Sequence, residues 1–443
     1  MPQFQQTFPE IAPGHSRYGF NTGFMTGMLE FGAFTGCLFF PVLADRYSRK
    51  LGLAVATAFS CVGAIIQTAA NNYGTLVAGR TIGGVGVGTL AMGAPLYISE
   101  IAPPNLRGSL LVLEAISIVI GAIVAFWITY GSRDISGDWA FKLPFLMQMA
   151  PALAVGIGIQ FFPFSPRWLA MRHRNQNALD SLAKLRSLPE TDARVQQEWK
   201  GIVREVEIQE LLLEREHGAS NNPVLLEFQQ WGDLFKPKYI RRTVVALAIP
   251  FFQQFSGINA FVYYAPIFFA ALGQDYEMSL IHSGMVKICQ FLTIFGGIAM
   301  GIPHMIMASV MNKYNNKWAD HSGMGWFGVA LIYIYVLAYA SSYGPLAWTL
   351  PAEVFPSSKR AKGVGAATAM VWLANFIIGV VVPEMQLKLS WGTYLIFGCF
   401  CFGASVFSFF LVPETAGKSL EQIAGAFGES LEDEEGVLLA RYR

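Results

Sequence analysis

The chain has 443 residues, of which 53% are hydrophobic and only 14% are charged, and its mean hydropathy is +0.41. An ordinary soluble domain carries about 25% charged residues, and a soluble fold of this length could not bury so much apolar surface, so composition predicts a membrane protein. The net charge of +1 gives no reason to expect a nucleic-acid partner. The five cysteines lie in apolar runs without metal-ligand spacing, and we expect no metal site and no cofactor.

Apolar runs long enough to cross a bilayer recur along the chain, since roughly 20 apolar residues span about 30 Å of hydrocarbon. They lie near residues 24–43, 52–70, 76–98, 109–130, 141–162, 243–270, 284–311, 326–350, 364–387 and 392–412. Residues 1–17 are polar, and no cleavable signal peptide is visible. The charged stretch 163–242 has apolar residues at helical spacing, which predicts amphipathic helices outside the bilayer. A solvated linker without further function is the alternative.

Basic residues indicate on which side of the membrane each loop lies, because cytoplasmic loops carry an excess of Lys and Arg. The loop around Arg46 and the stretch 163–242 are basic and are predicted to be cytoplasmic, whereas the loop at 71–75 lacks basic residues and is predicted to be external. The run between His282 and Lys313 is too long for one span and too short for two. We therefore expect that a connecting segment is missing there.

An acid and a cluster of bases follow the first apolar run. Asp45, Arg46 and Arg49 can pair with the ends of neighbouring helices and latch one conformation, as alternating access requires. Ordinary charge that sets the orientation of the chain is the alternative reading. The cluster marks a candidate switch at the cytoplasmic face.

The glycine-rich run 79–88 is superficially similar to a phosphate-binding loop. It lies inside an apolar span and lacks the lysine and the preceding strand, so close helix packing is the better prediction. Arg80, Glu100 and Arg107 are expected to extend the ionic cluster on the side of Asp45.

Polar side chains interrupt the sixth run. Gln253, Gln254 and Asn259 would be costly within a membrane unless they face a cavity or one another, and the same holds for Tyr263 and Tyr264. Amides offer both donors and acceptors, which suits a polyhydroxylated solute. Hydrogen bonding between helices is the alternative. Ser256-Gly257 is expected to loosen the helix between these residues.

A helix break is expected at Gly344-Pro345, in mid-span beside Trp348. Freed backbone groups are tolerated in a bilayer only where they line a cavity or find new partners. Trp348 could stack on the apolar face of a sugar. Glu353 and Arg360 repeat the pairing of an acid with a base at the cytoplasmic face.

Together these residues resemble the sugar porter family of the major facilitator superfamily, and the details are similar to fungal quinate-permease-like and hexose-transporter-like members. The matching pieces in chain order are Asp45-Arg46 with Arg49-Lys50, Gly79-Arg80, Pro163 to Trp168, Gln253 to Asn259, Gly344 to Pro356, Arg360 to Gly363 and Pro413 to Thr415.

The resemblance implies an all-α membrane protein with two helical bundles around a central pathway, joined by a cytoplasmic helical insert. The expected parts are an N-terminal bundle at 1–162, the insert at 163–242, a C-terminal bundle at 243–412 and a cytoplasmic tail at 413–443. It implies sugar contacts from Gln253, Gln254, Asn259, Trp348 and Asn375. It also implies cytoplasmic latches from Asp45, Arg46, Arg80, Glu100, Arg107, Glu353, Arg360 and Glu414.

Two departures from the family pattern matter. Where sugar-binding members carry a glutamine after Arg107, this chain has Ala115, which favours a quinate-like polyhydroxylated acid over a hexose. The first family helix and the loop between helices eight and nine, expected near Thr293 to Gly296, are absent from the pattern. We therefore expect about ten or eleven spans instead of twelve.

The sequence thus predicts transport of a sugar or quinate-like solute by alternating access, through proton symport or facilitated diffusion. The transporter would act as a single chain that crosses the plasma membrane several times. The alternatives are an inactive truncated transporter and a non-transporting membrane nutrient sensor. An enzyme is not expected, because the sequence holds no nucleophile–base constellation, metal set or cofactor loop.

Overall fold

The computed structural model describes residues 1–103, 106–218, 223–272, 297–314, 318, 320–340, 342–355, 359–412 and 427. Within these residues the chain is helical and contains no strand. The predicted missing loop near Thr293 to Gly296 and the tail residue Glu414 lie outside them.

The N-terminal half begins with two short helices, α1 (Pro2–Thr7) and the 3-10 helix η1 (Pro9–Ile11). Its long helices are α2 (Tyr18–Arg46), α3 (Arg49–Ala69), α4 (Tyr73–Ile101) and α5 (Arg107–Ser132). The last span of this half is formed by α6 (Trp139–Met147), α7 (Met149–Gly158) and the 3-10 helix η2 (Ile159–Phe161).

The described residues of the insert form four helices, α8 (Pro166–Met171), α9 (Asn175–Arg186), α10 (Ala193–His217) and α11 (Pro223–Asp233). The C-terminal half contains α12 (Ile240–Phe255), α13 (Ile258–Ala271), α15 (Gly297–Tyr314), α16 (Ser322–Ala340), α17 (Tyr343–Val354), α18 (Arg360–Leu389) and α19 (Trp391–Leu411).

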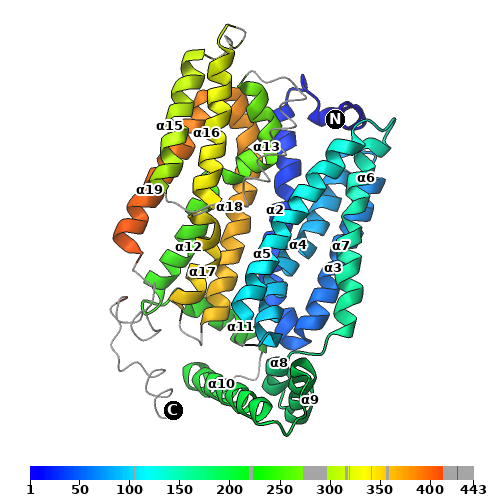
Figure 1. Cartoon of the computed structure of the whole chain (residues 1–443), viewed down its shortest axis with the longest axis vertical. Helices are drawn as coiled ribbons and strands as arrows, with labels where there is room; N and C mark the ends of the chain where they lie inside the picture. The colour runs from blue at the N-terminus through cyan, green and yellow to red at the C-terminus, as the bar shows by residue number, and fades with distance from the viewer. Residues whose placement is uncertain are drawn as a thin grey trace.

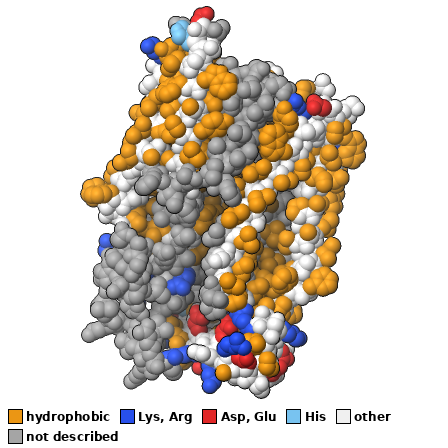
Figure 2. Space-filling view, viewed as in Figure 1, with side chains coloured by type: hydrophobic (Ala, Val, Ile, Leu, Met, Phe, Trp, Pro, Cys, Tyr) orange, Lys and Arg blue, Asp and Glu red, His pale blue; other side chains and the backbone are white. Residues whose placement is uncertain are grey.

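Two bundles stand side by side, and the insert lies across one end of the molecule, opposite the N-terminus (Figure 1). Hydrophobic side chains cover the long face over α5 and its neighbours, while charged side chains gather at the two ends (Figure 2). Nine helices of the described chain are long and apolar enough to cross a membrane. These features confirm the predicted all-α membrane fold. The insert lies at one end, and its basic residues predict that this end is cytoplasmic.

The glycine-rich run is a packing surface on α4, as predicted. A Cβ atom added at Gly84 would lie 2.1 Å from the carbonyl oxygen of Leu29, and one at Gly88 would lie 2.0 Å from that of Ala33. Backbones this close leave room only for glycine, which is how small residues hold transmembrane helices together without a hydrophobic driving force. The helix α2 is thereby fixed against α4.

The two bundles meet along α2 and α18 in the half of the molecule away from the insert. A Cβ atom at Gly23 would lie 2.2 Å from the carbonyl oxygen of Val380, and the rings of Phe31 and Phe376 are 5.3 Å apart. This contact closes the outer side between the bundles.

Candidate transport site

The span made of α12 and α13 is broken in its middle. The helix α12 ends at Phe255 and α13 begins at Ile258, and Gly257 between them has a φ of +93°, a conformation that residues with a Cβ rarely adopt. The predicted loosening at Ser256-Gly257 is confirmed. The break brings the polar side chains before and after it to one region.

A second break separates α16, which ends at Ala340, from α17, which begins at Tyr343, so the predicted Gly344-Pro345 lies in the first turn after the break. Gln253 is 2% exposed, and its Nε2 donates to the carbonyl oxygens of Tyr343 at 2.9 Å and Gly344 at 3.1 Å. An amide buried within a bilayer needs such partners. The amide of Gln253 therefore binds the backbone of the second break, and the alternative of hydrogen bonding between helices applies to this residue.

The neighbouring amides continue this bond into a chain. Gln254 Nε2 donates to Gln253 Oε1 at 3.1 Å, and Asn259 Nδ2 donates to Gln254 Oε1. Gln253 and Gln254 are buried, whereas Asn259 is half-buried. Of the three amides predicted to contact a solute, Asn259 at the accessible end of the chain is the one best placed to do so.

A buried carboxylate connects the two bundles. Glu30 of α2 is 3% exposed, and its Oε1 accepts from the hydroxyl of Tyr263 at 2.8 Å. Its Oε2 accepts from Nδ2 of Asn375 on α18 at 2.9 Å, and the same Nδ2 lies 2.8 Å from the Tyr263 hydroxyl oxygen. Charged groups are rare inside membranes and mark functional positions. This cluster is a buried polar link between the two bundles.

The sequence analysis did not identify Glu30, although the sequence indicates it. Glu30 is a single acid within an apolar run, and burying a charged group in a membrane costs more than burying an amide such as that of Gln253. Nothing in the sequence indicated Tyr263 and Asn375 as its partners, because the three residues come from different helices.

The structure corrects the prediction for Arg80. Its Nε donates to the carbonyl oxygen of Met25 at 2.7 Å, and its charge interacts with that of Glu30. At about 1.5 Å per residue, Arg80 and Glu100 lie about 30 Å apart along α4. Arg80 therefore belongs to the Glu30 cluster in the outer half and is not part of a cytoplasmic latch.

The remaining predicted pathway residues, Tyr264 and Trp348, belong to helices of the C-terminal bundle. The hydroxyl of Tyr264 donates to the carbonyl oxygen of Gly379 at 2.6 Å, which ties α13 to α18. Trp348 of α17 is 45% exposed, and its large apolar ring is available for contact.

The predicted cytoplasmic cluster assembles around Arg49. Its Nη1 lies 2.9 Å from Asp45 Oδ1, and its Nε lies 3.0 Å from Glu100 Oε1 at the end of α4. The structure thus brings Asp45, Arg49 and Glu100 together, and their role as a latch stays a prediction. Arg46 is exposed and lies on the insert side of α2. Arg360 is half-buried, and the side chains of Arg107 and Glu353 lie outside the described residues.

A second ionic cluster joins the insert to the C-terminal bundle, and the sequence analysis did not identify it. Lys359, at the start of α18, donates to Glu216 and, at 2.6 Å, to Asp233 Oδ2. His217 Nε2 lies 2.8 Å from the same oxygen, and Lys362 pairs with Glu227. Burial would raise the pKa of Asp233, but hydrogen bonds from Lys236 and Lys359 lower it below its usual range.

Glu216, His217 and Asp233 also offer metal ligands within 4.8 Å of one another. The ammonium group of Lys359 contacts both carboxylates and already supplies the positive charge. This arrangement fits an ion-pair cluster better than a metal site.

The two broken spans, the paired bundles and the polar cluster between them define a secondary transporter with the major facilitator superfamily fold. The proton:xylose symporter XylE of E. coli in complex with 6-bromo-6-deoxy-D-glucose is similar in structure, with a TM-score of 0.75 at 24% identity over 96% of this chain and 93% of that one. The family model for sugar (and other) transporters matches residues 3–427, and the chain belongs to this family of transporters, which are not enzymes.

Fungal relatives support the same family. An MFS glucose transporter of Aspergillus flavus is 30% identical over 93% of this chain and 82% of its own length. A high-affinity glucose transporter of Kluyveromyces lactis is 30% identical over 93% of this chain and 77% of its own length.

Proposed function

We propose that this chain carries a neutral monosaccharide across the plasma membrane, coupled to a proton, and that Glu30 is the group that links the two. The observation that carries the proposal is the bridge from Glu30 on α2 to Tyr263 and Asn375 in the other bundle.

The coupling follows from the contacts of Glu30. Opening the outer side requires α2 to leave α18, and the carboxylate would then lose the donors from Tyr263 and Asn375. Opening also admits water to the carboxylate, which solvates the charge that burial penalises. Protonation of Glu30 therefore favours the closed outer side, in which the carboxyl group is buried, and a charged Glu30 favours the open, hydrated one. Proton binding and closure of the outer side are thereby linked.

The charge of Glu30 and the side chains that can still contact a solute indicate the substrate class. Asn375 Oδ1 is buried without a hydrogen-bond partner among the described residues, so it can accept from a solute hydroxyl. Asn259 and the exposed ring of Trp348 supply a polar and an apolar contact of the kind that sugars use. The negative charge of Glu30 disfavours an anionic solute beside it. We therefore prefer a hexose to a quinate-like acid, in line with the glucose transporters among the relatives.

The test is uptake in a yeast strain that lacks its own hexose transporters. The wild-type chain should accumulate labelled glucose, and a protonophore should abolish that accumulation. The Glu30→Gln variant should exchange glucose across the membrane but should not accumulate it, because the glutamine cannot titrate. Glu384→Gln is the matched control, since Glu384 pairs with Lys388 at 2.7 Å on the partly exposed outer end of α18.

Each outcome decides one part of the proposal. Protonophore-sensitive accumulation by Glu30→Gln would refute the role of Glu30, and uptake of quinate in place of glucose would refute the substrate. Absence of any uptake by a correctly inserted wild-type chain would favour an inactive transporter.

A further inference from the structure

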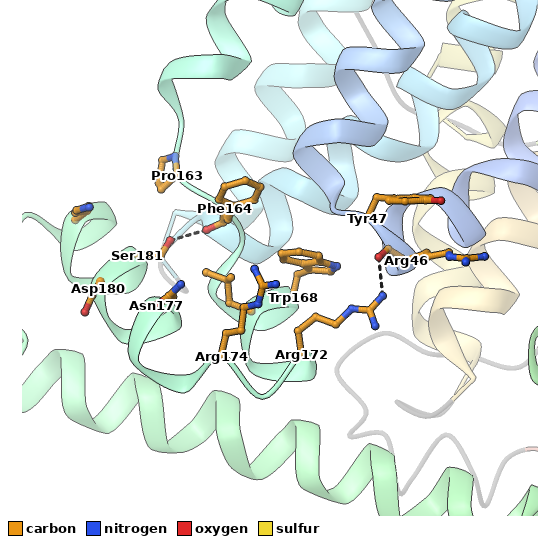
Figure 3. A pocket seen from close by; sticks show the side chains of 12 residues that line it. Arg46, Tyr47, Pro163, Phe164, Trp168, Arg172, Arg174, Asn177, Asp180 and Ser181 are labelled. Carbon is orange, nitrogen blue, oxygen red and sulfur yellow. Dashed lines mark hydrogen bonds between the residues drawn. The ribbon is translucent and has the colours of Figure 1, made fainter. Parts of the chain in front are cut away.

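A cavity of about 940 Å³ opens at the cytoplasmic end of α2, outside the transport pathway (Figure 3). It lies between the end of α2 and the insert helices α8 and α9. Its lining residues are Arg46, Tyr47, Pro163, Phe164, Trp168, Leu169, Arg172, Arg174, Asn177, Asp180, Ser181 and Lys184. We call it the insert groove. Its volume is within the range of small-molecule sites.

The insert groove is strongly basic. Arg46, Arg172, Arg174 and Lys184 line it, against a single acid, Asp180. Asp180 Oδ1 already accepts from Gln176 Nε2 at 2.9 Å. None of the four cations forms an ion pair with an acid in the described part of the chain, although three other insert arginines, Arg167, Arg186 and Arg194, do. The groove therefore holds positive charge without a protein counter-charge.

The floor of the groove is rigid. Arg172 Nη2 donates to the carbonyl oxygens of Asp45 at 2.9 Å and Arg46 at 2.6 Å, which caps the end of α2. Trp168 Nε1 donates to the same Asp45 carbonyl at 3.1 Å. Both described bonds of Arg172 come from one of its nitrogens, so the other donors of the guanidinium group remain available for a ligand.

The groove lies at the level of the membrane surface. The span that precedes it ends at Phe161, which is 84% exposed, and Phe162, Phe164 and Tyr47 are also exposed. Exposed aromatic rings at the end of an apolar span are typical of the interface between lipid and water. An anion bound here would be within reach of both the headgroup layer and the cytosol.

We infer that the insert groove binds the phosphorylated headgroup of an anionic membrane lipid. Arginine forks match phosphate oxygens in geometry and charge, and basic pockets at the cytoplasmic ends of transmembrane helices suit such headgroups. Because the groove is built from both α2 and the insert, a bound headgroup would hold α8 and α9 against the N-terminal bundle.

The experiment uses the full chain in lipid nanodiscs that contain phosphatidylcholine with or without phosphatidylinositol 4-phosphate. Native mass spectrometry counts the bound anionic lipids. The test variant Arg174→Gln with Lys184→Gln removes two exposed cations of the groove. The control Arg194→Gln with Lys200→Gln removes the same charge from the insert outside the groove. Each cation near an anionic membrane surface contributes to the affinity for the lipid. The loss of two cations should therefore weaken lipid binding by the test variant on the order of 30-fold, and binding by the control variant should not change.

Three outcomes would overturn the inference. Equal loss in the test and control variants would mean diffuse attraction of the insert to anionic lipid. Undiminished binding in the test variant would mean that the groove is not the site. Displacement of the lipid by soluble inositol 1,4-bisphosphate at equal concentration would mean that the groove takes a cytosolic phosphate ester and not a lipid.

Discussion

Replacing Lys359 by methionine tests how the insert is held to the C-terminal bundle. Lys359 and Asp233 side chains are each 2% exposed, and their charged atoms are 2.6 Å apart. Methionine keeps most of the volume of lysine but leaves the carboxylates of Asp233 and Glu216 without their shared ammonium group. Removing one partner of a buried ion pair is strongly destabilising, because the other charge stays buried.

The magnitude follows from that cost. At about 3 kcal/mol, the low end for breaking a buried pair, the equilibrium for local release of the insert should rise on the order of 100-fold. Cleavage of a native protein at low protease concentration follows the population of the open form. Thermolysin should therefore cut α10 and α11 of Lys359→Met on the order of 100 times faster than those of the wild type.

A control on the same helix makes the result specific. Lys388→Met breaks the pair of Lys388 with Glu384, in which the lysine side chain is 73% exposed, and should change cleavage less than about 3-fold. Adding Asp233→Asn to Lys359→Met should restore part of the protection, because it removes the buried charge that keeps Lys236 but has lost Lys359. Equal cleavage rates for Lys359→Met and the wild type would refute the reasoning.

Three further results are expected. The pKa of Asp233 is lowered in the folded protein, so the stabilising contribution of Asp233 is present above about pH 4 and is lost as the pH falls through the folded pKa. Hydrogen exchange of α10, corrected for intrinsic rates, should show this loss in the wild type and not in Asp233→Asn. Gly88→Leu should lower the unfolding temperature in detergent, because its Cβ would lie 2.0 Å from the Ala33 carbonyl oxygen, whereas Gly121→Leu faces open space and should not. Gln253→Leu should destabilise the protein by about 1 to 3 kcal/mol in SDS unfolding, since it loses two bonds to carbonyl oxygens at the start of α17. Asn259→Leu loses the one described bond of Asn259 and should destabilise it by less.

The sequence predicted the spans and the helix breaks well, because a bilayer imposes simple rules on both. Each span must form the hydrogen bonds of its backbone within itself and must be about 20 residues long. Apolar runs of that length therefore located the long helices. The same rules explain why Gly257 and Gly344 marked the broken spans. The glycine run on α4 was assigned to packing for a local reason, since it lacked the strand and lysine of a phosphate loop.

The candidate site was predicted less well, because its contacts join helices that are distant in the sequence. Arg80 was grouped with Glu100 because both are charged residues of the same apolar run. The predicted external loop at 71–75, however, places Arg80 near the outer end of α4. Lys359 was not identified as a candidate, since its partners Glu216 and Asp233 lie in the insert, more than 100 residues away in the sequence. Pairings of this kind depend on tertiary structure and leave no periodic signal.

Two sets of ionic contacts, one at Arg186 and one at Lys359, attach the insert to the two bundles. Arg186 binds Glu198 at 2.6 Å and the Ile101 carbonyl at 2.9 Å, which attaches the first part of the insert to α4 of the N-terminal bundle. Lys359 attaches its last part to α18 of the C-terminal bundle. The insert therefore spans the two bodies that must separate when the cytoplasmic side opens. Because α18 also carries Asn375, which binds Glu30, movement of this one helix connects the Lys359 cluster to the carboxylate between the bundles. Loosening the Lys359 cluster should thus shift the balance between outward and inward states, and not only the stability of the insert.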